Sequence, residues 1–319
     1  MRALGPGARS GDSRERPVIL FYNDFFGRPP DTRSLARCDG CIFTTDRRAY
    51  SKAAAVVFHV PSMRKLPRLR KRRGQLWVAW SMESDVNYPL LRDRDFMGAF
   101  DLTMTYRRSS DVWCSYLPWA SAFEDAVSAP LPDKTADAPV VMLQSASIDR
   151  SGRIPLAREL MNRIPVHSYG RFMNNRQFPL EDRGSETKRA LIGSYKFCIA
   201  FENSIAVDYV TEKLFDPLLA GSVPVYLGAP NADSFAPASD SFINASKFAG
   251  PAELAEYLTW LDSDDEAYRQ YFRWRERGLS PQFRQLLSDA EKEPFWHLCE
   301  IVAARSAEQV RRWQWPWRS

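Results

Sequence analysis

Three polar side chains directly follow an apolar run in the second half of the chain. Residues 196–201 read KFCIAF, and Glu202, Asn203 and Ser204 come next. An apolar run without alternation is typical of a central parallel strand that is buried on both faces. Ligands of α/β sheets bind just beyond the carboxyl ends of such strands. The three residues are therefore candidate ligand contacts, although a turn capped by Asn203 and Ser204 fits the pattern equally well.

The sequence T-E-K, a few residues later, is expected to open a helix. Unpaired N–H groups and the helix dipole at such a start stabilise an anion. Lys213 adds a full positive charge that suits a diphosphate, and Glu212 can accept hydrogen bonds from sugar hydroxyls. Both types are also common on exposed helix starts, so the residues alone favour function only modestly. Pro217 predicts either a kinked helix or one whose regular hydrogen bonding begins near Asp216.

A further carboxylate follows an apolar run in the first half. Glu83 comes shortly after residues 76–80, LWVAW, and is expected at the carboxyl end of a buried strand, facing a cleft. A carboxylate placed there can take the proton of a hydroxyl nucleophile. An exposed loop acid is the alternative interpretation, and Asp24, Asp85 and Glu124 are rival candidates for the same role.

Strand-like runs alternate with helix-length segments on both sides of a Pro-, Ala- and Asp-rich stretch at 128–139, which we interpret as a linker. This alternation predicts two α/β domains with parallel sheets around a ligand-binding cleft. We predict strands at 18–22, 41–44, 54–59, 76–80, 102–106, 140–144, 166–169, 196–201 and 223–227. We predict helices at 155–163, 186–193, 252–261 and 267–277.

Composition excludes several classes of protein. The 319 residues are 45% hydrophobic and 13% aromatic, which is enough for packed cores and argues against disorder outside the ends. No apolar stretch approaches the roughly 20 residues of a membrane span, and residues 1–16 do not resemble a secretory signal. The odd number of cysteines, five, favours reduced thiols. These features predict a cytoplasmic protein, soluble or peripherally attached.

Two basic segments suggest contact with anions. Residues 64–73, RKLPRLRKRR, form either a solvated loop or helix or a footprint for phosphates or an anionic membrane. Nucleic acid is not an expected partner, because no binding module or interleaved aromatic residues accompany the run. The tail at 300–319 carries Trp313, Trp315 and Trp317 with four arginines, so it either contacts a membrane interface or packs back on the body.

A set of motifs in a fixed order resembles the α1,3/α1,4-fucosyltransferases of glycosyltransferase family 10. The donor-site block is FENS followed by YVTEKLFDPLLAGSVPVYLG. Further similar segments are FTTDRR, AAAVVFHVPSM, GQLWVAWSMES, FDLTMTYRRSSDVWCSY, VHSYGR and YFRWR. The resemblance covers residues from about 38 to about 277. It implies a GT-B fold, with two Rossmann-like domains facing each other across a cleft. It also implies inverting transfer of L-fucose from GDP-β-L-fucose, with O3 of GlcNAc in a glycan as the expected acceptor.

The resemblance also assigns domains. It implies an acceptor-binding domain at 17–133 and a GDP-fucose-binding domain at 134–290. We further predict a disordered segment at 1–16 and a C-terminal helix or tail at 291–319. Eukaryotic members carry a membrane anchor and stem that are absent here. A bacterial-type cytoplasmic enzyme, or a trimmed chain from the Golgi lumen, is therefore expected.

Residue roles follow from the same resemblance. Glu83 matches the general base. Arg153, Asn203, Tyr209, Glu212 and Lys213 match donor-binding positions, with Arg150 and Arg158 as neighbours that could replace Arg153. Further donor candidates are Tyr169, Gly170, Glu202, Ser204 and Val210. Acceptor candidates are Asp24, His59 and Asn87, although each histidine is also interpretable as structural.

No metal and no cofactor is expected to be required. The two D-x-D sequences, at 93–95 and 262–264, do not follow buried strands, and the second is interpreted as a helix cap. Two alternatives to the fucosyltransferase hypothesis remain: an enzyme of the same fold with another donor sugar or acceptor, and a non-catalytic glycan-binding relative. The presence of Glu83, Asn203, Glu212 and Lys213 counts against the non-catalytic relative.

Overall fold

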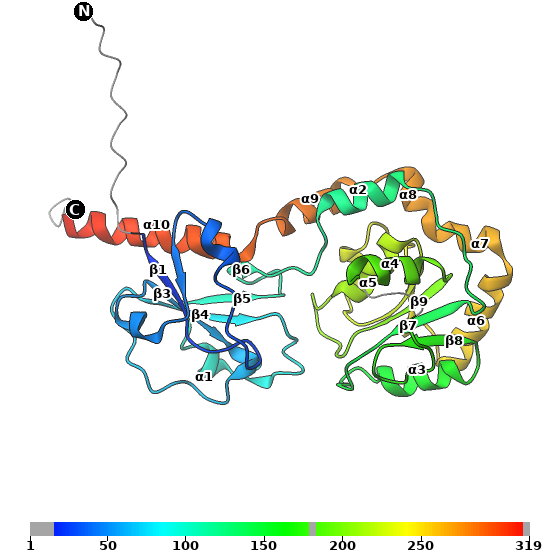
Figure 1. The fold of residues 1–319 in the computed structure, drawn as a ribbon, viewed down its shortest axis with the longest axis horizontal. Helices are drawn as coiled ribbons and strands as arrows, with labels where there is room; N and C mark the ends of the chain where they lie inside the picture. Colours follow the sequence, from blue (N-terminus) through cyan, green and yellow to red (C-terminus); the bar gives the residue numbers. More distant parts are fainter. Residues whose placement is uncertain (1–15, 179–182, 315–319) are drawn as a thin grey trace, which may run out of the picture.

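The computed structural model describes residues 16–178 and 183–314, and for residues 309–314 it describes the backbone only. The predicted disordered stretch, apart from residue 16, and the last five residues of the Trp-rich tail lie outside this range. Two α/β bodies stand side by side, each built on a parallel sheet (Figure 1). We call the body that contains β1–β6 the first unit and the one that contains β7–β11 the second unit. The predicted GT-B architecture, two parallel α/β domains, is confirmed.

The first sheet has the strand order β2-β1-β3-β4-β5-β6, and every pair is parallel. Its two central strands are buried along their whole length, which explains why they read as continuous apolar runs. The strands are β1 (Val18–Phe21), β2 (Ile42–Thr44), β3 (Ala55–His59), β4 (Leu76–Ser81), β5 (Leu102–Thr105) and β6 (Val112–Trp113).

The second sheet has the order β11-β10-β9-β7-β8, again with parallel pairs. Its strands are β7 (Val140–Leu143), β8 (Val166–Tyr169), β9 (Phe197–Phe201), β10 (Val223–Leu227) and β11 (Ile243–Asn244). After β7 the chain adds β8 on one side and β9 on the other. The strand order therefore reverses between β7 and β9, and the carboxyl ends of these two strands form the edge where ligands of open α/β sheets bind.

Helices cover both sheets and connect the units. They are α1 (Arg94–Met97), α2 (Ala120–Ser128), α3 (Arg153–Met161), α4 (Ser185–Gly193), α5 (Glu212–Ala220), α6 (Pro251–Ser263), α7 (Asp265–Arg269), α8 (Arg273–Arg277), α9 (Pro281–Ala290) and α10 (Pro294–Gln314). Short 3-10 turns lie at 34–37, 47–51, 60–62, 89–92, 232–235, 245–247 and 270–272. None of the helices within the described residues is long and apolar enough to cross a bilayer.

The chain crosses between the two units twice (Figure 1). Phe123 of α2 is fully buried in the second unit, where its ring contacts Phe215 of α5 and Phe283 of α9. Helix α10 crosses in the opposite direction, and its Leu298 and Val302 are buried in the core of the first sheet. The predicted domain ranges differ from this arrangement in two places. Helix α2 lies in the range predicted for the first domain but packs on the core of the second unit. Helix α10, predicted as a separate C-terminal segment, packs on the core of the first unit.

Two local predictions, on α5 and on residues 267–277, need correction, whereas the loop interpretation of the basic run and the reduced cysteines agree with the structure. Helix α5 begins at Glu212 and includes Pro217 in its interior, so the alternative start near Asp216 is wrong. The single helix predicted over 267–277 is divided into α7, a 3-10 turn and α8. The basic run at 64–73 is an irregular loop before β4 with no helix, and most of its cationic side chains are exposed. All five cysteines are buried and unpaired.

Candidate active site

Glu83 lies in the turn that follows β4. The Ser81 hydroxyl accepts a hydrogen bond from the Glu83 backbone N–H and donates one to the Glu83 carbonyl, both at 3.0 Å, which fixes the turn. The side chain is half-buried, and this burial raises the pKa of the carboxyl group above its ordinary value. Lys213 and a hydrogen bond from Tyr209 act in the opposite direction and favour the carboxylate. A base with a raised pKa accepts a proton more readily near neutral pH.

The rival carboxylates are less suitable as bases. Asp85 is buried and accepts hydrogen bonds from the Tyr106 hydroxyl (2.9 Å) and from Arg107 (2.6 Å). Burial alone would raise the pKa of Asp85, but its hydrogen bonds from arginines and Tyr106 hold that pKa below the ordinary value. Glu124 pairs with Arg284 on the surface at 3.2 Å. Asp24 is exposed.

Glu202 anchors the start of α5 from within the protein. It is fully buried just past the end of β9, and its two carboxylate oxygens accept bonds from the Thr211 backbone N–H (2.8 Å) and hydroxyl (2.9 Å). Thr211 in turn caps α5 through its side chain. Burial raises the pKa of Glu202, while Lys213 lowers it. Glu202 therefore positions the turn before α5 by holding Thr211.

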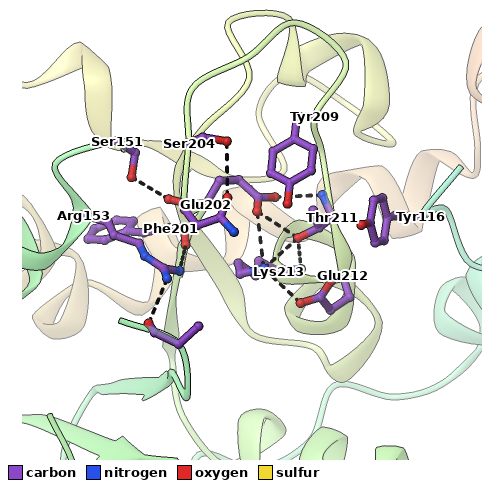
Figure 2. Close-up of polar contacts among 12 residues, drawn as sticks. Tyr116, Ser151, Arg153, Phe201, Glu202, Ser204, Tyr209, Thr211, Glu212 and Lys213 are labelled. Carbon is purple, nitrogen blue, oxygen red and sulfur yellow. Dashed lines mark hydrogen bonds and ion pairs between the residues drawn. The ribbon is translucent and has the colours of Figure 1, made fainter. Parts of the chain in front are cut away.

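Lys213 is held among oxygen atoms at the start of α5 (Figure 2). Its Nζ lies 3.0 Å from both the Thr211 hydroxyl and Glu212, and 3.4 Å from Glu202. Burial lowers the pKa of Lys213, but the two carboxylates outweigh that effect and raise it. The side chain therefore remains a cation, next to a helix start that favours anions.

Side chains from both units meet next to Glu83. The Tyr209 ring packs edge-on against Tyr106 (centroids 5.0 Å apart) and against Tyr116 (6.2 Å), both from the first unit. The Asn87 side-chain amide donates to the Asn203 side-chain oxygen at 2.8 Å, again across the junction. These contacts bring Glu83 of the first unit within electrostatic range of Lys213 of the second.

Arg153, predicted to contact the donor, is hydrogen-bonded mainly to backbone carbonyls within the protein. It is almost fully buried at the start of α3, and its guanidinium donates four hydrogen bonds to backbone carbonyls. The acceptors are Ile148 (3.1 and 2.7 Å), Ala146 (3.0 Å) and Phe201 (3.2 Å). Among the described residues, one of its five N–H groups lacks an acceptor. Arg150 is exposed, and its backbone N–H donates to Asn203 at 2.7 Å.

The remaining donor candidates divide into two groups. Ser204 is buried beside Asn203 and donates to its side-chain oxygen at 3.3 Å, so it belongs to the cluster. Val210 packs in the core behind α5. Tyr169 ends β8, which is separated from β9 by β7 in the sheet, and its hydroxyl lies 3.0 Å from that of Tyr195. It therefore does not belong to the cluster after β9.

Close contacts within the protein account for Gly170 and His59. Gly170 has φ +96°, and a Cβ there would lie 2.5 Å from the Gln144 carbonyl oxygen, so close backbone contact requires glycine. His59 is buried among aromatic rings, its Nδ1 lies 2.8 Å from the Ser62 hydroxyl, and burial lowers its pKa to about 4. A neutral histidine held in this way fits the structural interpretation better than acceptor contact.

The D-x-D carboxylates serve as caps and ion-pair partners. Asp93 accepts bonds from the first N–H groups of α1, and Asp264 caps α7. Asp262 pairs with Lys196 at 3.3 Å. Within residues 16–178 and 183–308, no cluster of three or more histidine, cysteine, aspartate or glutamate side chains is arranged to hold a metal ion.

Sequence reasoning missed the aromatic residues at the junction. Tyr116 lies beside the Thr211, Glu212 and Lys213 side chains in Figure 2, and its hydroxyl donates to the Met82 carbonyl at 2.7 Å, next to Glu83. Tyr106 connects Asp85 to Tyr209. Both lie in the segment FDLTMTYRRSSDVWCSY. The predicted strand at 102–106 included Tyr106, but β5 ends at Thr105, so Tyr106 stands directly at its carboxyl end, whereas Tyr116 follows no strand directly.

Comparison with known proteins identifies related sequences along most of the chain. A model of the N-terminal fucosyltransferase domain matches residues 14–117. The model for the C-terminal part of glycosyltransferase family 10 (fucosyltransferase) matches residues 132–314. The junction contacts described above connect these two matched regions.

Individual relatives are consistent with these matches. The chain is 36% identical over 297 residues to 4-galactosyl-N-acetylglucosaminide 3-alpha-L-fucosyltransferase FUT6 of Pan troglodytes, covering 87% of this chain and 78% of that protein. It is 32% identical over 300 residues to GDP-fucose protein O-fucosyltransferase 3 of Homo sapiens, covering 87% and 61%. A crystal structure of alpha1,3-fucosyltransferase with GDP-fucose has a similar fold, with a TM-score of 0.54, 16% identity and coverage of 89% and 92%.

Proposed function

The chain belongs to glycosyltransferase family 10, the fucosyltransferases, and we propose that it transfers L-fucose from GDP-β-L-fucose, with inversion, to O3 of a GlcNAc residue in a glycan. One observation carries the mechanism. The turn that carries Glu83 meets the second unit through Tyr116, whose hydroxyl donates to the Met82 carbonyl at 2.7 Å and whose ring lies 6.2 Å from that of Tyr209. This arrangement supports a proton acceptor from the first unit that works together with Lys213, the cation for the leaving group, from the second.

In the proposed reaction, Glu83 removes the proton from the acceptor hydroxyl. The acceptor oxygen forms a bond to C1 of fucose while the bond from C1 to the β-phosphate oxygen breaks, and GDP leaves with the electron pair. Attack from the face opposite GDP converts the β-linked donor into an α-linked product. A positioned general base contributes roughly 10²–10⁴-fold to such a rate.

We assign the developing charge on the diphosphate to Lys213, the start of α5 and the remaining N–H group of Arg153. Charge-assisted hydrogen bonds of this kind contribute about 1.5–3 kcal/mol each. Asn203, Tyr209 and Glu212 are the proposed contacts for the nucleotide and its sugar. Because cationic side chains supply the charge, the proposal requires no metal ion.

The main test separates chemistry from donor binding. We expect Glu83→Gln to retain GDP affinity, measured by calorimetry, and to lose about 10²–10⁴-fold in transfer to an N-acetyllactosamine acceptor. Glu124→Gln, which removes an exposed carboxylate at a surface ion pair, serves as the matched control and should retain full activity. Full transfer by the Glu83 variant would remove this residue from the mechanism.

A second candidate acceptor is a hydroxyl group on a protein. It is favoured by the similarity to GDP-fucose protein O-fucosyltransferase 3, which extends over 87% of this chain. Transfer assays with GDP-fucose and either free glycans or folded protein domains would distinguish the two acceptors. Determination of the linkage by NMR would test the assignment to O3.

A further inference from the structure

A pocket of about 530 Å³ lies in the second unit between α6, α7 and the strand β11. In Figure 1, α6 and α7 lie at the end of the molecule farthest from the first unit, the unit to which Glu83 belongs. This volume falls within the range of small-molecule sites. The side chains that matter for its chemistry are Asp240, Asn244, Lys247, Tyr257, Trp260 and Tyr271.

One wall of the pocket is aromatic and accessible. Trp260 is 49% exposed although it is a large apolar side chain, and its ring lies 5.4 Å from that of Tyr257. Phe248 continues the wall at 5.3 Å from Tyr257. Aromatic faces carry partial negative charge. They attract the weakly positive C–H groups on the face of a pyranose ring, in the same sense as they attract cations.

Hydrogen-bonding groups surround this wall. The hydroxyls of Tyr257 and Tyr271 lie 2.7 Å apart, so one proton is donated within the pair and the other is available to a ligand. The side-chain oxygen of Asn244 accepts from Ser246, and its NH₂ group has no acceptor within the described parts of the chain. Lys247 adds an exposed donor, and Asp240 adds an exposed acceptor that also pairs with Arg277 at 3.6 Å.

We propose that this pocket is a saccharide-binding site, separate from the transfer site. A sugar ring presents an apolar C–H face together with a rim of hydroxyls, and the pocket offers an aromatic wall together with a rim of donors and acceptors. Such a site would retain a branched or extended glycan on the enzyme, and its ligand class follows from the pocket alone rather than from the proposed reaction.

The proposal can be tested with the full chain and defined saccharides. Saturation-transfer NMR with N-acetyllactosamine, lactose and chitobiose would measure binding, and hydrogen–deuterium exchange would locate it. We expect at least one of these probes to protect residues 240–271 and to bind Trp260→Ala about tenfold more weakly. The saccharide should protect residues 240–271 in Lys213→Ala as it does in the parent protein. A defect in GDP binding can therefore be distinguished from a defect in saccharide binding at this pocket.

Two controls keep the result interpretable. Trp119→Ala removes another exposed tryptophan, 62% accessible and outside the pocket, and should leave binding unchanged. Trp260→Ala should retain the melting temperature and the GDP affinity of the parent protein. The proposal is overturned if none of the three saccharides protects 240–271, or if Trp260→Ala binds all of them as the parent does. It is also overturned if GMP alone protects the pocket.

Discussion

The cost of removing the Arg153 guanidinium can be estimated, because four of its five N–H groups donate to backbone carbonyls inside the protein. Replacement by methionine keeps most of the hydrocarbon stem but removes four hydrogen bonds to backbone carbonyls, with lengths from 2.7 to 3.2 Å. Ala146 and Ile148 are exposed residues, so water can replace the lost donors there. The carbonyl of Phe201, a buried residue at the end of β9, would be left without this donor.

The expected cost follows from these differences in exposure. An unsatisfied buried acceptor costs about 1–3 kcal/mol, and the partly rehydrated carbonyls add to this, for a total of about 3 kcal/mol. A unit of this size loses roughly 2–4 °C in melting temperature per kcal/mol. We therefore expect the second unit of Arg153→Met to melt about 10 °C lower than in the parent protein.

Thermal unfolding followed by circular dichroism would measure this shift. Arg150→Met is the matched control, because Arg150 is exposed and its side chain has no hydrogen bond to another described residue, so its change should stay within about 0.5 kcal/mol. A parent-like melting curve for Arg153→Met would refute the reasoning. It would show that the carbonyl bonds contribute nothing and that the guanidinium is retained for another purpose.

Four further predictions concern the proposed chemistry. Transfer should increase with pH as Glu83 loses its proton, with a midpoint above the ordinary 4.5 because burial raises that pKa. Tyr209→Phe should move this limb to higher pH in a pH–rate profile, because the lost hydrogen bond favours the carboxylate, whereas an unmoved limb would exclude the contact. Lys213→Ala should weaken GDP binding by about tenfold or more in calorimetry, and parent-like affinity would contradict its role. Activity should persist in EDTA, and an absolute requirement for Mn²⁺ would direct attention back to the D-x-D carboxylates.

The positions of Glu83 and of the cluster after β9 could be predicted because both follow strands buried on two faces. Such strands appear in the sequence as uninterrupted apolar runs, and their carboxyl ends share one edge of a sheet. The start of α5 was also predictable, since Thr211 is a good cap. The extent of α5 was not, because packing against neighbouring elements overrides the local cost of Pro217.

The surroundings of Arg153 and the tyrosines at the junction could not be predicted from local patterns. The carbonyls that Arg153 contacts come from the loop after β7 and from the end of β9, which are brought together only by the strand order. Tyr116 and Tyr209 are far apart in the sequence and meet only because the two units do. The same explanation holds for α2 and α10, whose apolar faces do not reveal which sheet they will cover.

The exchange of α2 and α10 between the units affects the order in which the protein can be completed during synthesis. The sheet of the first unit is translated early, but Leu298 and Val302, which complete its core, are translated only after every strand of the second sheet. The second unit has all its core-forming segments earlier, including α2. The nascent chain therefore carries an unfinished apolar surface on its first unit while the whole second unit is made, and this is the interval in which a chaperone would have most to protect.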